Sequence, residues 1–282
     1  MTVLVFGRTG QVATELQRQA EVIALGRDRA DLSRPETCAA AIEAHQPQVV
    51  INAAAWTAVD RAEEEEALAT RINAEAPGAM ARACAGRGIP FLHISTDYVF
   101  DGSGATAWRE TDPVSPQNAY GRSKLAGEEA VREAGGRHAI LRTSWVFSAH
   151  GQNFVKTMLR LSETRRALNV VEDQVGCPTP AADIAATLLT VAEALAGGHG
   201  GGTYHYGGQP PASWKDLARE TFRLAGRQVR VTGIPGSAYP TPAQRPLNSR
   251  LNCAKIMTDF GITPPDWKTG LERVLGELGT KA

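Results

Sequence analysis

Short apolar runs alternate with longer helical patterns through the first half of this 282-residue chain. Each apolar run is short enough for a buried strand, and the Ala- and Glu-rich stretches between the runs are long enough for helices. This alternation predicts an α/β fold with a doubly wound parallel sheet that helices cover on both faces. The predicted strands are Val3–Phe6, Val22–Leu25, Val49–Asn52, Phe91–Ile94 and Ala139–Arg142, and the predicted helices cover 11–20, 36–45, 61–86 and 121–134.

The pattern changes after about residue 147. One more helix–strand unit over 151–171 and an Ala-rich helix over 181–196 precede a glycine cluster, and prolines punctuate the chain beyond it. We therefore expect a smaller C-terminal lobe that faces the carboxyl edge of the sheet, where open α/β sheets bind their ligands. The predicted sheet domain covers 1–147, with 168–200 returning to it, and the predicted substrate-binding lobe covers 148–167 and 201–282.

The composition argues against nucleic acids and membranes as binding partners. Lys and Arg together number 30, as do Asp and Glu, so the formal net charge is zero and no basic excess favours nucleic acid. No apolar run approaches the roughly 20 residues that span a bilayer, so we expect no membrane insertion. The four cysteines are far apart and form no metal-binding pair, which suits a reducing cytoplasm.

A glycine-containing turn joins the first predicted strand to the first predicted helix. The segment Gly7–Ala13 has the spacing GxxGxxA. Gly7 permits a tight turn, and Gly10 lets the backbone approach a pyrophosphate. The helix start at Gln11 and Val12 then supplies backbone amides and the positive end of the helix dipole. The turn predicts a dinucleotide site, and with it a Rossmann-like sheet.

The end of the second predicted strand bears on the choice of coenzyme. That strand runs into Gly26 and Arg27, where an acidic side chain would hold the ribose 2′-hydroxyl of NADH. A guanidinium can instead pair with a 2′-phosphate, and Arg8 lies in the first turn nearby. We predict NADPH as the preferred coenzyme. NADH stays an alternative, because Asp28 follows directly.

Two further segments are candidates for the cofactor site. Asp31 and Leu32 follow the second strand, where they would frame the adenine, although an ordinary helix-capping turn explains them equally well. The third strand ends in three alanines, Ala53–Ala55, and bulkier side chains there would block a cofactor that crosses the strand ends. Small residues in this place therefore favour a bound dinucleotide.

A tyrosine and a lysine one helical turn apart provide candidate acid–base chemistry. Tyr120 and Lys124 share one face of a predicted helix. A phenol has an ordinary pKa of about 10, and a nearby ammonium would lower this pKa toward a useful range. Ser95 and Thr96 follow the fourth predicted strand, so a hydroxyl there would point at the same substrate carbonyl. This set predicts proton transfer to a ketone beside a nicotinamide.

Taken together, these motifs resemble those of the extended short-chain dehydrogenases/reductases and, more narrowly, of the dTDP-4-dehydrorhamnose reductase family. The resemblance extends through nearly the whole chain, including the expected substrate lobe. The segments that carry it are Gly7–Gln11, Asn52–Asp60, Ser95–Phe100, Tyr120–Lys124, Arg142–Phe147, Asn153–Met158, Asp173–Thr179 and Tyr239–Leu251.

The resemblance implies a role for each matched residue. Tyr120 would be the proton donor, Lys124 would lower its pKa and anchor the nicotinamide ribose, and Thr96 would tune proton transfer. By the same resemblance, Ala55, Trp56 and Thr57 would line the cofactor, and Asp97, Trp145, Arg245 and Asn248 would bind the substrate. Two positions depart from the family pattern: Trp56 stands where relatives often have His, and Gly26 where some carry an acidic residue.

The implied reaction is reduction of dTDP-4-dehydro-L-rhamnose to dTDP-L-rhamnose by hydride transfer from NAD(P)H, the last step of dTDP-L-rhamnose biosynthesis. Two alternatives on the same fold stay open: a non-catalytic NADP-binding regulatory subunit, and a sugar-nucleotide epimerase or dehydratase. Some family members use Mg²⁺ at an interface, but the sequence identifies no metal site here. A homodimer also stays open.

Overall fold

A six-stranded parallel sheet forms the centre of the protein, of which the computed structural model describes residues 1–280. The strands lie in the order β10-β5-β4-β3-β1-β2, and all neighbours run parallel. The order reverses between β1 and β3, whose carboxyl ends therefore flank the place where doubly wound sheets bind ligands. The strands are β1 (Val3–Phe6), β2 (Ile23–Leu25), β3 (Val49–Asn52), β4 (Phe91–Thr96), β5 (His138–Thr143) and β10 (Gly201–His205).

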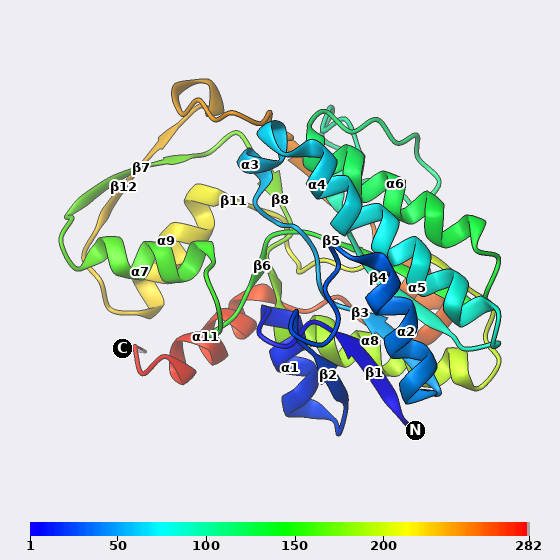
Figure 1. Cartoon of the computed structure of the whole chain (residues 1–282). Coiled ribbons are helices and arrows are strands. Elements are labelled where there is room, and N and C mark those ends of the chain that lie inside the picture. The colour runs from blue at the N-terminus through cyan, green and yellow to red at the C-terminus, as the bar shows by residue number, and fades with distance from the viewer. Residues whose placement is uncertain (281–282) are drawn as a thin grey trace.

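Helices cover both faces of this sheet (Figure 1). α1 and α8 pack on one face, where Leu16 and Leu188 join a buried apolar cluster with the strands. α2, α5 and α6 cover the other face through Ile42, Met80 and Val131. The predicted α/β class with a doubly wound parallel sheet is confirmed. These helices are α1 (Gln11–Gln19), α2 (Pro35–His45), α5 (Ala76–Ala85), α6 (Ala119–Glu133) and α8 (Ala181–Ala196).

The apolar runs form strands because both faces of the sheet are covered. Every residue of β1 and β3 is buried, so neither strand needs the alternation of apolar and polar residues that marks a half-exposed strand. β4 continues beyond the predicted run to Thr96, whose side chain therefore lies at the carboxyl edge of the sheet.

The edge strand β10 lies in the main sheet, although the predicted domain boundaries placed residues 201–282 in the smaller lobe. β10 pairs in parallel with β5, from Gly201 beside His138 to His205 beside Arg142. The glycines hid this strand, but the pairing requires one of them, because a Cβ at Gly201 would lie 1.9 Å from the His138 carbonyl oxygen. Residues 201–205 therefore belong to the sheet.

The single helix predicted over 61–86 is broken into shorter elements. A π-helical turn interrupts it at Arg71–Glu75, and such turns are frequent at functional sites. The turn brings the Asn73 backbone against α6, where a Cβ at Gly127 would lie 2.0 Å from the Asn73 carbonyl oxygen. The elements are α3 (Val59–Glu64), α4 (Glu66–Thr70), the π turn and α5.

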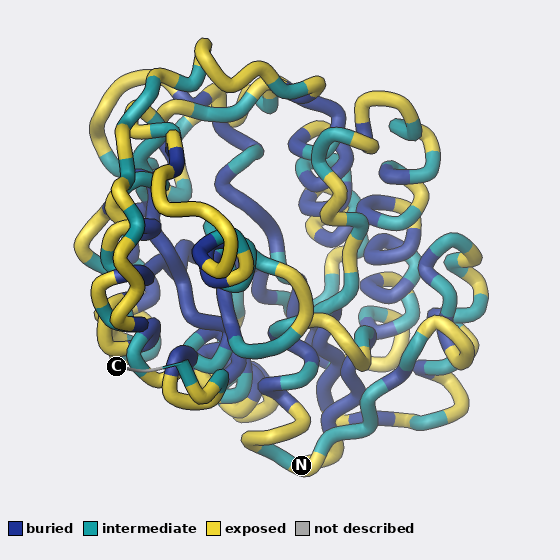
Figure 2. Tube along the Cα trace, turned by 90° about the vertical axis from the view of Figure 1, so that its left-hand side faces the viewer, coloured by how far each residue is buried: buried dark blue, intermediate teal, exposed yellow. Residues whose placement is uncertain are grey.

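A smaller lobe lies beside the carboxyl edge of the sheet, at the left of Figure 1. Its two apolar clusters include Trp267, Leu217 and Phe222. Figure 2, with the lobe side toward the viewer, shows buried segments in the interior of the molecule and exposed loops around them. Within residues 1–280, no helix is both long and apolar enough to cross a membrane. The elements outside the main sheet include α7 (Phe154–Ser162), α9 (Trp214–Leu224), α10 (Ala254–Phe260), α11 (Trp267–Glu277), β6 (Val146–Phe147), β7 (Ala167–Val171), β8 (Val175–Gly176), β9 (Thr179–Pro180), β11 (Ala212–Ser213), β12 (Arg230–Ile234) and β13 (Asn248–Ser249).

Candidate active site

The turn after β1 fits a bound pyrophosphate. Gly7 has a φ of 110°, and a Cβ at this position would lie 3.3 Å from the Ala53 carbonyl, so only glycine suits this close approach. Gly10 is the N-cap of α1, and no side chain among the described residues caps this helix. The first amides of α1 are thus available to an anion, as in dinucleotide-binding folds. The residues present therefore fit the dinucleotide that the motif predicts.

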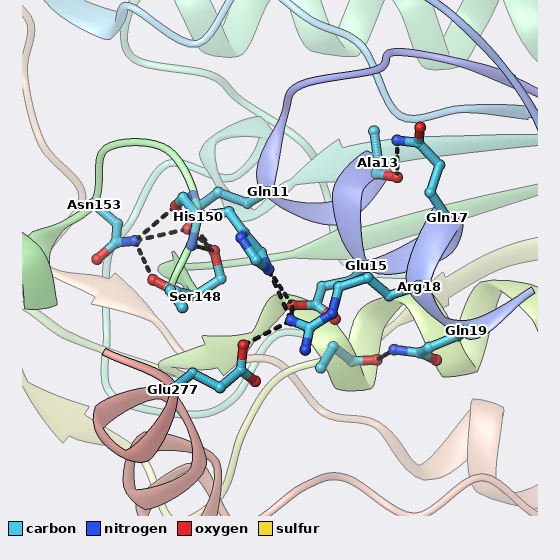
Figure 3. A network of polar contacts seen from close by, with 12 residues as sticks. Gln11, Ala13, Glu15, Gln17, Arg18, Gln19, Ser148, His150, Asn153 and Glu277 are labelled. Carbon is cyan, nitrogen blue, oxygen red and sulfur yellow. Dashed lines mark hydrogen bonds and ion pairs between the residues drawn. The ribbon is translucent and has the colours of Figure 1, made fainter. Parts of the chain in front are cut away.

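The predicted cofactor residues Gln11 and Val12 contribute to this turn through their backbone. Val12 is buried in the core of the sheet domain. The Gln11 side chain turns toward the lobe, where its Oε1 accepts hydrogen bonds of 2.9 Å from both Ser148 Oγ and Asn153 Nδ2 (Figure 3). Asn153 is also the N-cap of α7, so Gln11 links the cofactor turn to the first helix of the lobe.

The end of β2 presents positive charge to solvent. The Arg27 side chain is 81% exposed, and its Nε lies 3.2 Å from Asp31 Oδ2. A Cβ at Gly26 would lie 2.6 Å from Asp28 Oδ1 and 3.5 Å from Arg8 Cδ, so the absence of a side chain there lets Arg8 approach the strand end. Leu32 instead packs into the core beneath α2, a structural role that its apolar side chain explains.

The loop after β3 is held in place by an asparagine that the sequence did not single out. Asn73 Oδ1 accepts a 2.8 Å hydrogen bond from the Trp56 amide, and its Nδ2 donates to the Trp56 carbonyl and to Ser123 Oγ. The flanking Ala55 and Thr57 are exposed at the carboxyl edge of the sheet. Asn73 thereby connects the predicted cofactor loop with α6, and it does so from the π-helical turn.

Thr96 and Tyr120 come together at the carboxyl end of β4. Asn118 caps α6 by accepting a 2.8 Å hydrogen bond from the Gly121 amide, which places Tyr120 in the first turn of the helix. Burial raises the pKa of the Tyr120 phenol to about 12, although its hydrogen bond with Thr96 opposes the rise. Tyr120 is therefore a neutral proton donor in this state, paired with the predicted hydroxyl.

Lys124 makes its hydrogen-bond contacts with β4. Its Nζ points beneath the site, where it donates a 2.7 Å hydrogen bond to the Ile94 carbonyl and lies 3.2 Å from His93 Nε2. Burial lowers the pKa of Lys124 to about 8, which opposes a fixed ammonium there. Burial dominates the pKa of Tyr120 in this state, so the expected lowering of that pKa by Lys124 stays a prediction.

Asp97 lies beside Thr96, whose Oγ1 donates a 3.1 Å hydrogen bond to Asp97 Oδ1, and Trp145 follows β5, the strand that pairs with β4. Burial raises the pKa of the Asp97 carboxyl to about 6, and its Oδ2 has no hydrogen-bond partner among residues 1–280. Trp145 has a φ of 49°, a conformation that is costly for a bulky residue. Its ring stacks on Trp214 with centroids 3.6 Å apart. A buried acceptor and a strained aromatic residue suit a polar substrate, in line with the predicted roles.

The two predicted substrate residues of the last segment behave differently. Arg245 Nη2 pairs with Asp60 Oδ2 at 2.7 Å, while its buried Nη1 has no hydrogen-bond partner in the described chain. Asn248 is almost completely buried; its Nδ2 donates to the carbonyls of Ser103 and Thr106. Arg245 retains a free donor for a ligand, whereas the Asn248 side chain is already used to hold a loop.

A buried ion-pair network fastens α6 to the sheet. Both Glu128 oxygens accept hydrogen bonds from Arg142, at 2.8 and 2.7 Å, and the two side chains are at most 2% exposed. Ser95 and Arg132 donate to the same carboxylate. Ser95 directly precedes Thr96 on β4, and Glu128 lies on the helix that carries Tyr120. The network therefore fixes the two elements that present the candidate acid–base pair.

One cluster within residues 1–280 has the composition of a metal site. Glu15, His150 and Glu277 bring their ligand atoms within 4.8 Å of one another. Arg18 lies between them: its Nη1 is 3.2 Å from Glu15 Oε1 and 2.6 Å from Glu277 Oε2 (Figure 3). Because a guanidinium already neutralises these carboxylates, the residues do not fit the Mg²⁺ ion that the family resemblance left open.

Comparison with known proteins agrees with the geometry. The family described as RmlD substrate binding domain matches residues 1–280. A dTDP-4-dehydrorhamnose reductase from Sinorhizobium fredii is 44% identical over 289 residues, covering 99% of this chain and 98% of that protein. The solved dTDP-4-dehydrorhamnose reductase from Clostridium acetobutylicum is 38% identical with a TM-score of 0.93, over 99% of this chain and all (100%) of that one.

A second solved structure carries the coenzyme. The dTDP-4-dehydrorhamnose reductase from Bacillus anthracis, in complex with NADP, is 33% identical with a TM-score of 0.92, and the match covers 98% of this chain and 100% of that one. The similarities thus extend over both the sheet domain and the lobe. The predicted resemblance is confirmed, and the chain belongs to the dTDP-4-dehydrorhamnose reductase family of NADP-dependent sugar-nucleotide reductases.

Proposed function

We propose that the protein reduces dTDP-4-dehydro-L-rhamnose to dTDP-L-rhamnose with NADPH. The observation that carries this proposal is the proximity of Thr96, at the carboxyl end of β4, and Tyr120, in the first turn of α6, with the Thr96 hydroxyl favouring the charged form of the phenol. The glycine turn follows β1 of the same parallel sheet, and so lies at the same edge. Family membership supports the same reaction. The cytoplasmic location and a homodimer stay predictions of the sequence.

Each residue of the site has its own role in the reduction of the ketone. Bound NADPH supplies the hydride. The Tyr120 hydroxyl gives its proton to the carbonyl oxygen at sugar C4, and Thr96 donates a hydrogen bond to the same oxygen as negative charge develops. The free Nη1 of Arg245 binds the diphosphate of the substrate. Asp97 and Trp145 hold the sugar so that its carbonyl faces Tyr120.

A turnover assay tests this proposal. We expect the protein, mixed with dTDP-4-dehydro-L-rhamnose and NADPH, to oxidise one coenzyme for each dTDP-L-rhamnose formed, measured at 340 nm and by mass spectrometry of the product. An epimerase or dehydratase would convert sugar without net coenzyme consumption. A regulatory subunit would bind NADPH without converting the sugar, and either result would contradict the proposal.

Coenzyme preference is a separate prediction. We propose that Arg27, with Arg8 beside it, binds the 2′-phosphate of NADPH, so Arg27→Ala raises the KM for NADPH about tenfold and leaves the KM for NADH nearly unchanged. Arg29→Ala is a matched control, because Arg29 is an exposed cation of the same turn. If Arg27→Ala raised the KM for NADPH and for NADH equally, Arg27 would not bind the 2′-phosphate of NADPH.

A further inference from the structure

A chain of three buried polar side chains runs beneath the candidate active site. Asn52 Nδ2 lies 3.1 Å from His93 Nδ1, and His93 Nε2 lies 3.2 Å from Lys124 Nζ. All three residues are at most 2% exposed. Asn52 is on β3, His93 on β4 and Lys124 on α6. The three hydrogen-bonded side chains therefore connect the end of β3, which leads into Ala53–Ala55, with the helix that carries Tyr120.

The hydrogen bonds at one end of this chain select a tautomer for His93. The Ala54 amide donates a 3.2 Å hydrogen bond to Asn52 Oδ1, which turns the Nδ2 of that amide toward His93. Asn52 Nδ2 can only donate, so Nδ1 of the neutral imidazole must accept and Nε2 must carry the proton. The His93 Nε2–H then points at Lys124 Nζ, which must offer a lone pair to accept this hydrogen bond.

A neutral amine at Lys124 satisfies this arrangement, and an ammonium does not. The amine accepts from His93 Nε2 and donates to the Ile94 carbonyl at 2.7 Å. An ammonium has only donors, so it requires an unprotonated Nε2 and a proton on Nδ1. Asn52 would then have to turn Oδ1 toward His93, and the Ala54 amide would lose its acceptor.

The charged groups near Lys124 are already paired with other residues, so its hydrogen-bond contacts are His93 and the Ile94 carbonyl. Glu128, one turn further along α6, raises the pKa of Lys124, but Arg142 from β5, Arg132 and Ser95 already bind that carboxylate. Burial, the larger effect, lowers the pKa of Lys124 to about 8. Asp97 and Tyr120 belong to the site itself, and burial raises the pKa of each.

We propose that His93 is a positioning residue for Lys124, and that the tautomer of its imidazole couples protonation of the Lys124 amine to the orientation of Asn52 and the loop after β3. This inference rests on the proposed function only where it concerns turnover. Gain of a proton at Lys124 frees the Ala54 amide, and binding of a coenzyme against the loop in turn biases the charge on Lys124.

The tautomer can be observed directly, without activity. Histidine rings labelled with ¹⁵N give separate Nδ1 and Nε2 chemical shifts, and the spectrum of His93→Gln assigns the His93 pair among the six histidines. We expect His93 to stay neutral and to change from the Nδ1–H to the Nε2–H tautomer between about pH 6.5 and about pH 10, as Lys124 loses its proton. A single tautomer over this range, or the same change in Lys124→Met, would overturn the proposal.

Kinetics supply the second test. In His93→Gln, the glutamine carbonyl can accept a hydrogen bond from the Lys124 ammonium without any movement of Asn52. The charged form of Lys124 is thereby favoured and its pKa rises. The part of the kcat–pH profile that follows the protonation of Lys124 should therefore shift to higher pH by about one unit. His93→Phe offers neither donor nor acceptor, and its kcat should fall about tenfold because Lys124 loses its partner.

The matched control is His45→Gln, a histidine at the end of α2, which should behave as the wild type in both tests. Lowered thermal stability with an unshifted kcat–pH limb in His93→Gln would show that His93 is merely structural, and would overturn the proposal. Failure of the wild type to oxidise NADPH would instead refute the proposed function, while the ¹⁵N titration would still decide the role of His93.

Discussion

We expect the Tyr120→Phe enzyme to lose between about 10² and 10⁴ in kcat, the range typical of removing a general acid. Phenylalanine preserves the ring and its edge-on contact with Tyr98, at 5.5 Å between centroids, so the loss reflects the missing proton rather than packing. Coenzyme affinity should change little, because Tyr120 pairs with Thr96 rather than supporting the turn after β1. Stopped-flow oxidation of NADPH and a fluorescence titration measure the two quantities.

Tyr98→Phe is the matched control for this experiment. It removes a second, half-buried phenol that contacts the Tyr120 ring, but leaves both Tyr120 and the Thr96 hydroxyl in place. Its kcat should fall much less than that of Tyr120→Phe. Equal losses in the two variants would mean that the chemistry does not depend on Tyr120 in particular.

The largest expected effect on stability comes from the network beneath the catalytic helix. Glu128→Ala should lower the free energy of unfolding by about 3–5 kcal/mol, since it leaves the buried Arg142 guanidinium without its counter-charge. Arg142 cannot escape by losing its proton. Thermal unfolding followed by circular dichroism measures the change as a lower midpoint.

The neighbouring residue provides the control for that measurement. Glu129 is exposed on α6, so Glu129→Ala removes the same functional group from the same helix without uncovering a buried charge. Its midpoint should stay close to that of the wild type. Were Glu128→Ala equally mild, the network would contribute little to holding α6 on the sheet.

The sequence predicted the elements that local patterns specify. Continuous apolar runs identified β1 and β3 because a strand covered on both faces needs no alternation. The spacing of Gly7 and Gly10 predicted the turn after β1, since the φ of 110° and the contact with Ala53 allow no side chain. Fold class and family are thus readable from the chain alone.

Long-range contacts account for what the sequence did not predict. β10 begins with glycines that read as a loop, and only pairing with His138 reveals them as a strand. His93 appeared to be an ordinary strand residue, because its partners Asn52 and Lys124 are 41 and 31 positions away. The inward direction of Lys124 likewise depends on the Ile94 carbonyl, a backbone acceptor that no motif encodes.

The packing of α8, β10 and α10 against the sheet has a consequence for engineering. The chain leaves the sheet domain for the lobe near Phe147, returns for α8 and β10, leaves again for α9, and comes back for α10 before ending in α11. No single pair of cut sites can therefore excise the substrate-recognition half. To transfer the sugar specificity of a relative, several separate segments must be exchanged together. A single contiguous segment would contain residues from the apolar cores of both the sheet domain and the lobe.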